Sequence, residues 1–87
     1  MSRLAFAANR MYPVTPSDSL PLTDPADNVA KGGYIRCTGT AGNIVLIDGV
    51  GNQRTYPVAS GETITCYAAK VFATNTTATG LWCFAEL

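Results

Sequence analysis

The sequence of 87 residues contains no histidine and little charge, and each shortage excludes a class of protein. Histidine is the commonest general base near neutral pH, so no catalytic triad that depends on it can form here. Lysine and arginine number 6 together, as do aspartate and glutamate, and no run of either sign occurs. Phosphate binding needs clustered positive charge. We therefore predict neither an enzyme nor a nucleic-acid partner.

The cysteines number only three. Cys37, Cys66 and Cys83 are an odd number, which does not suit a disulfide framework, and they lack the short paired spacing of a metal site. We interpret each one as a small apolar side chain within a strand, and we expect no metal and no cofactor. The carboxylates are scattered, and Asp18, Asp24 and Asp48 suit turns in which aspartate binds its own backbone.

Long hydrophobic runs are absent. The apolar stretch at residues 4–8 spans only five residues and is soon followed by Arg10, so it is too short for a secretory signal. No other stretch approaches the length of a membrane span. We expect a chain that is made and used without export and without a membrane partner.

Apolar residues are abundant, at 47% of the sequence against 14% charged. So short a domain buries only a modest fraction of its surface, and neither disulfides nor a metal are expected to stabilise it. We therefore predict that the chain associates with itself as a cyclic homo-oligomer.

Prolines mark a distinct N-terminal region, because four of the five fall between residues 13 and 25. They exclude a helix or a central strand there and favour a stiff, extended chain. We predict an extended arm over residues 1–32, in which residues 11–31 leave their own domain and lie across a neighbouring copy or the capsid of a particle. The alternative, a disordered tail, leaves the apolar side chains of this region unexplained.

From residue 33 onward, short β-branched and aromatic runs alternate with glycine and asparagine, a pattern typical of strands and turns. We predict an all-β fold for residues 33–87, a small antiparallel β-sandwich or barrel of about six short strands. The predicted strands are residues 33–38, 43–48, 53–58, 62–67, 69–74 and 80–86. In the fourth, Ile64, Cys66 and Ala68 should share the buried face.

Two of these strands are apolar on both faces, at residues 44–47 and 81–84. A domain this small cannot enclose both, so one face of each should meet another subunit or the arm. Pro57 places its strand at an edge or a bulge, where a strand from another chain can add. The candidate subunit or capsid interface consists of Phe6, Tyr12, Val14, Leu20, Leu22, Val45, Ile47, Trp82 and Phe84.

Three segments resemble, in the same order, the spike base proteins of gene transfer agents and related tailed phages. They are residues 14–19 (VTPSDS), 39–44 (GTAGNI) and 70–78 (KVFATNTTA), and the resemblance covers most of residues 14–87. The chain departs from that family in its longer link over residues 23–31, in its cysteines and in Trp82.

The resemblance implies a virion component that forms an oligomeric β-structured base on the head and holds a spike or fibre protein. It also implies the major capsid protein as a partner, a location on the outer surface of the head, and assembly in the cytoplasm of the bacterial host. No catalytic role is implied.

Three functions follow as hypotheses. The first is a structural virion protein, either a head spike base or a capsid decoration (cement) protein. The second is a small β-barrel binding module that uses its aromatic face for sugar or nucleic acid. The third, an enzyme with a site between subunits, is disfavoured by the lack of histidine. The aromatic face of the second would draw on Tyr34, Tyr56, Tyr67, Phe72 and Trp82 beside Arg36, Arg54 and Lys70.

Overall fold

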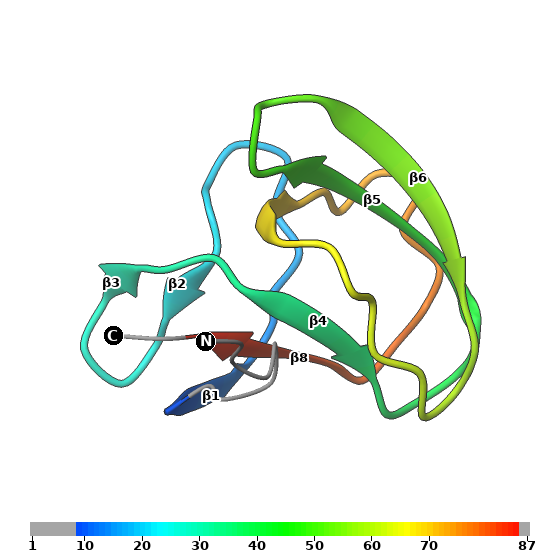
Figure 1. Cartoon of the computed structure of the whole chain (residues 1–87), viewed down its shortest axis with the longest axis horizontal. Helices are drawn as coiled ribbons and strands as arrows, with labels where there is room; N and C mark the ends of the chain where they lie inside the picture. Colours follow the sequence, from blue (N-terminus) through cyan, green and yellow to red (C-terminus); the bar gives the residue numbers. More distant parts are fainter. Residues whose placement is uncertain (1–8, 86–87) are drawn as a thin grey trace, which may run out of the picture.

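A computed structural model describes residues 9–85, which form eight short strands in three antiparallel sheets and contain no helix (Figure 1). The predicted all-β class is confirmed. One sheet, here the terminal sheet, has the order β1-β8-β4. Its strands are β1 (Arg10–Pro13), β8 (Leu81–Ala85) and β4 (Tyr34–Cys37).

A second three-stranded sheet, here the central sheet, has the order β6-β5-β7. Its strands are β6 (Gln53–Val58), β5 (Gly42–Asp48) and β7 (Ala68–Val71). A small hairpin of β2 (Thr23–Asp24) and β3 (Val29–Ala30) lies beside the terminal sheet (Figure 1). Five of the six predicted strands therefore correspond to observed ones, with shifts of a few residues at their ends.

The core lies between the two larger sheets. Ile35, Cys37 and Cys83 are fully buried on the inner face of the terminal sheet, and Ile44 and Val71 on the central sheet. Val45, on the opposite face of β5 from Ile44, is only 4% exposed, so this single chain buries both faces of β5 there. We predicted that one face of this strand meets another subunit or the arm. Val45 needs no such partner, because its own chain already covers it.

Residues 62–67 do not form the predicted strand. The backbone of Arg36 pairs with that of Thr63, and the backbone of Gly33 pairs with that of Ala68. The four residues 33–36 therefore lie opposite the six residues 63–68. The two extra residues bulge outward, as at a β-bulge, and residues 65–67 are all exposed. Ile64 and Ala68 are buried as predicted, but Cys66 is exposed, which corrects the interpretation of Cys66 as a buried strand residue.

The two prolines within strands, Pro13 in β1 and Pro57 in β6, both lie where the missing N–H costs no hydrogen bond. The Val14 N–H donates to the Leu81 C=O, so the backbone of Pro13 points away from β8. The N–H groups of Asn43 and Val45 bond Thr77 and Thr76, away from β6, so the alternate residues of β5 bond β6. In that register Pro57, opposite Asn43, directs its backbone to the outer edge of the sheet. The predicted edge position of Pro57 is confirmed.

The N-terminal region is extended, as its prolines predict, but it lies against its own chain. β1 pairs with β8, the Ser17 N–H donates to the Val71 C=O (2.9 Å), and the Leu22 N–H donates to the Ala69 C=O (3.1 Å). The edges of β8 and β7 bind this segment directly. The structure thus differs from an arm whose residues 11–31 leave their own domain, whereas the division of the chain at residue 32 stays a prediction.

Candidate functional site

The first and third of the resembling segments meet at Asp18. One oxygen of its carboxylate accepts the N–H groups of Ala73 (3.0 Å) and Thr74 (2.9 Å), and the other accepts the Thr74 hydroxyl (2.5 Å). The Lys70 ammonium donates to the Asp18 C=O (2.6 Å) and lies 4.5 Å from the centre of the Phe72 ring. The bonds from Thr74 hold the pKa of Asp18 below its ordinary value.

The second and third segments meet along a threonine-rich stretch, residues 74–79. Its hydroxyl oxygens accept backbone N–H groups, from Asn43 to Thr77 (2.9 Å) and from Val45 to Thr76 (3.0 Å). A Cβ on Gly42 would lie 2.6 Å from the Thr77 hydroxyl oxygen and 2.7 Å from the backbone N of Ala78, so only glycine permits this approach. All three segments therefore form one continuous joint that holds the chain together.

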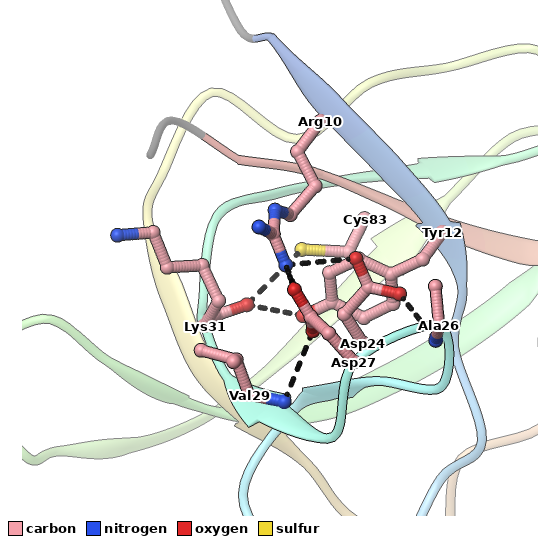
Figure 2. A network of polar contacts seen from close by, with 8 residues as sticks. All are labelled: Arg10, Tyr12, Asp24, Ala26, Asp27, Val29, Lys31 and Cys83. Carbon is pink, nitrogen blue, oxygen red and sulfur yellow. Dashed lines mark hydrogen bonds and ion pairs between the residues drawn. The ribbon is translucent and has the colours of Figure 1, made fainter.

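A polar network joins β1 to the β2-β3 hairpin (Figure 2). Nη1 of Arg10 lies 2.9 Å from an oxygen of Asp24 and 2.9 and 3.1 Å from the two oxygens of Asp27. One cation thus faces two carboxylates, and the Lys31 ammonium points away from them (Figure 2). The cluster of Arg10, Asp24 and Asp27 keeps an excess of negative charge beside β1.

Beneath this cluster, the buried Tyr12 hydroxyl donates to the Lys31 C=O, and the Cys83 thiol lies 3.9 Å from the same oxygen. Burial, followed by the contact with Cys83, raises the pKa of Tyr12. Burial also raises the pKa of the Cys83 thiol, which disfavours the reactive thiolate. Tyr12 and Cys83 are both buried, so this part of the network packs within the core.

The described carboxylates all have structural partners. Asp24 accepts the Ala26 N–H (2.9 Å), and Asp48 accepts the N–H groups of Val50 (3.0 Å) and Asn52 (2.9 Å), so the predicted turn roles of these two residues are confirmed. Glu62 accepts the Ala59 N–H (2.8 Å). Asp18 instead binds a segment distant in sequence. No group of three or more potential metal ligands gathers within residues 9–85.

The outer face of the terminal sheet carries a row of large side chains. Because directly paired residues point to the same side, Tyr34, Phe84 and Met11 form one row across the three strands. Arg36, Trp82 and Pro13 form the next. We call these six residues the outer face; Met11 and Pro13 are exposed, and the other four are half-buried. Its one charged side chain, Arg36, also donates to the Thr63 hydroxyl (3.1 Å).

This composition matches the centre of protein–protein interfaces, where aromatic residues, methionine and arginine are enriched. Trp82 and Phe84 were predicted as interface residues from the sequence, whereas Met11, Tyr34 and Arg36 were not. A period of two along residues 34–36 was the available signal, but only the pairing with β8 shows that these side chains join Trp82 and Phe84.

The other predicted interface residues lie in different places. Tyr12, Leu22 and Val45 are buried in this chain, Val14 packs partly buried against the core, and Ile47 is half-buried. Leu20 is 64% exposed, and Phe6 lies outside the described residues. The structure does not bring the nine predicted residues together on one surface, and a role for each in an interface stays a prediction.

Among residues 9–85, the structure has no helix of the length and apolar character needed to cross a membrane. No protein-family model and no curated protein matches the chain. A solved structure, described as the capsid of a native GTA (gene transfer agent) particle computed with C5 symmetry, contains a similar chain. The two are 36% identical with a TM-score of 0.70, and the match covers 88% of this chain and 82% of the other. Identity at this level over most of both chains shows that the present chain belongs to the same family as that gene transfer agent capsid component, a family of phage-like head proteins.

Proposed function

We propose that this chain is a structural virion protein of a tailed phage or phage-like particle, on the outer surface of the head. Within that class it acts as a head spike base or a capsid decoration protein. The observation that carries the proposal is the match, over 88% of the chain, to a component of a gene transfer agent capsid. The described carboxylates and the buried thiols already have structural roles, so we assign no catalysis.

The protein acts by self-association into a cyclic homo-oligomer and by docking on the major capsid protein, where it holds a spike or fibre protein. The outer face is the docking surface that the geometry supports best. It gathers Trp82, Phe84, Tyr34 and Met11 on one side of a sheet with a single cation. A few such residues supply most of the binding free energy in many interfaces.

The same outer face favours a second candidate function. Tyr34, Trp82 and Phe84 give three aromatic side chains on a sheet, an arrangement that suits stacking on a sugar ring or a base. A nucleic acid requires clustered cations, and the outer face offers only Arg36. A soluble glycan is the ligand class to test, by titration with tryptophan fluorescence of Trp82 as the signal.

Mass spectrometry of purified particles from the source tests the first proposal. We expect peptides of this chain in a fixed ratio to the major capsid protein, retained after a density gradient and a high-salt wash. If the chain is absent from particles that contain all other head proteins, the proposed virion function is wrong.

A further inference from the structure

In the two larger sheets, the outer edges of β4 and β7 bond the segments 61–64 and 17–22, whereas the outer edges of β6 and β1 have no backbone partner among the described residues. These two edges lie at opposite ends of the molecule (Figure 1). β6 has only β5 as its neighbour and β1 has only β8. Figure 1 shows β6 along the upper rim and β1 at the bottom. Residues 53–57 are exposed on both faces, so β6 projects from the body with its outer edge accessible.

The hydrogen-bond pattern shows which backbone groups face outward on each edge. On β6 these are the N–H and C=O of Gln53 and Thr55, and the C=O of Pro57. On β1, the bond from the Val14 N–H to the Leu81 C=O fixes the alternation, so the N–H and C=O of Met11 and the C=O of Pro13 face outward. Each edge has one proline at its C-terminal end and therefore lacks one donor there.

An antiparallel pairing of these two edges fits both prolines. With Thr55 opposite Met11, the two residues exchange both N–H···O=C bonds, and the Gln53 N–H reaches the Pro13 C=O. A shift of two residues in one direction sets Pro57, which has no N–H, opposite Met11 and loses one bond. A shift in the other direction sets Gly51 opposite Pro13, and the Gly51 N–H already donates to the Asp48 C=O. The register also keeps the inner faces of the two sheets on the same side.

Charge supports the same register. This register sets Arg54 of one copy opposite Tyr12 of the next. Arg54 then lies beside the cluster in which Arg10 faces both Asp24 and Asp27 (Figure 2). The Arg54 side chain is 66% exposed and its contact with Asp48 is long, at 4.0 Å. A second cation would neutralise the excess negative charge of that cluster.

We propose that β6 of one copy adds to β1 of the next copy, so that the central sheet of one chain and the terminal sheet of its neighbour become one six-stranded sheet. Because the two edges differ, the contact is head-to-tail, and it closes into a ring or extends as a filament according to the angle between copies. The inference rests on the proposed self-association and assigns it to a surface and a register.

Disulfide trapping tests the register. The paired residues would have Cα atoms about 5.5 Å apart, within the range of about 4.4 to 6.8 Å that a disulfide spans. In a background with Cys66→Ser, the full chain carrying Met11→Cys and Thr55→Cys is oxidised mildly at micromolar concentration. We expect a ladder of covalent multimers on a non-reducing gel, ending at the size of the closed ring. Each single variant should give dimers at most.

The matched control pairs Met11→Cys with Val50→Cys, because Val50 is 82% exposed in the β5-β6 turn but lies outside the register. A ladder of equal yield from both double variants, or none from the Thr55 pair, overturns the inference. Light scattering on the unmodified chain separates the two proposals. A monomer there contradicts the proposed self-association itself, whereas an oligomer without the Thr55 ladder contradicts only the β6-β1 contact.

A charge reversal gives a second readout without cysteine. We expect Arg54→Glu to weaken self-association at least tenfold by light scattering, while Arg54→Lys retains it and thermal melts of both variants stay near the parent. Added salt should weaken the parent oligomer but not the Arg54→Glu chain. Assembly of Arg54→Glu at the parent affinity would overturn the charge argument and, with it, the register.

Discussion

The carboxylate of Asp18 shows how one side chain can bind two distant parts of a small β-protein. Its partners, Ala73 and Thr74, are 55 and 56 residues away in sequence. A turn aspartate with partners two residues away would leave the 14–22 segment free to move, whereas here the carboxylate anchors that segment beside the end of β7. Its contribution depends on the negative charge of the carboxylate.

We predict that Asp18 makes the protein sensitive to acid. The folded-state pKa is lowered from an ordinary value of 3.8, so the stabilisation is complete above that value and is lost as the pH falls below it. Asp18→Asn should lower the melting temperature at neutral pH by a few degrees and flatten its decline between about pH 5 and pH 2. Thermal melts across that range measure both effects.

Asp48 sets the control for this experiment, because bonds from Asn52 and Val50 also lower its pKa. The Asp18→Asn chain should therefore keep a residual acid sensitivity that Asp48→Asn removes. If Asp18→Asn and the parent lose stability in parallel down to the lowest pH, the long-range bonds of Asp18 contribute nothing to folding.

At the scale of elements, the joint between β5 and the threonine-rich stretch depends on close backbone approach. We predict that Gly42→Ala destabilises the protein by about 1–3 kcal/mol, because the new Cβ would contact the Ala78 backbone, which cannot move aside cheaply. Urea unfolding followed by circular dichroism measures the change. Gly49→Ala is the matched control, since its Cβ would only reach ordinary contact with Tyr67 at 3.5 Å. Equal unfolding curves for the two variants would contradict a tight joint.

The N-terminal segment is a second element whose role the structure changes. Tyr12 and Leu22 belong to the core, and β1 pairs with one side of β8. Deleting residues 1–31 should therefore abolish cooperative thermal unfolding, whereas a separate β domain over residues 33–87 would keep it. As graded controls, Leu22→Ala should cost about 2–5 kcal/mol and Tyr12→Phe, which loses one hydrogen bond, about 1 kcal/mol. A truncated chain that melts like the parent would show that the division at residue 32 is real.

Strands β4, β5, β6 and β8 were predictable because glycine and asparagine separate β-branched and aromatic runs. The strand over residues 62–67 was wrong because a two-residue bulge is set by pairing with β4 and leaves no mark in the alternation. β1 was missed because the prolines, which exclude a helix or a central strand, led us to assign residues 1–32 to an extended arm, although Pro13 is compatible with an edge strand.

The candidate surface was predictable only in part, for a related reason. Trp82 and Phe84 have a clear alternating pattern, but which residues lie beside them depends on strand order. β8 pairs with β4 on one side and with β1 on the other, and neither is its neighbour in sequence. Met11 and Tyr34 therefore join the outer face through tertiary pairing that periodicity cannot show.

For the whole molecule, we predict that the outer face determines incorporation into particles. Trp82→Gln and Phe84→Gln replace half-buried aromatic groups, so each variant should fold but bind particles at least tenfold less well, since interface aromatics often contribute about 2 kcal/mol or more. Co-sedimentation with particles that lack the endogenous protein measures binding. Val50→Gln, at the exposed β5-β6 turn, should bind like the parent. Unchanged binding by both outer-face variants would exclude this face from docking.

The pairing of Arg10 with Ala85 joins the two ends of the described chain in one sheet, and it has a consequence for biosynthesis. Translation delivers β1 well before β8, so the terminal sheet cannot form until residues 81–85 have left the ribosome. Closing so long a loop is entropically costly, and folds dominated by such distant contacts form slowly, on the order of milliseconds to seconds. The terminal sheet therefore forms late in folding, and nascent chains that still lack β8 cannot use a completed β1-β8 sheet to assemble with each other.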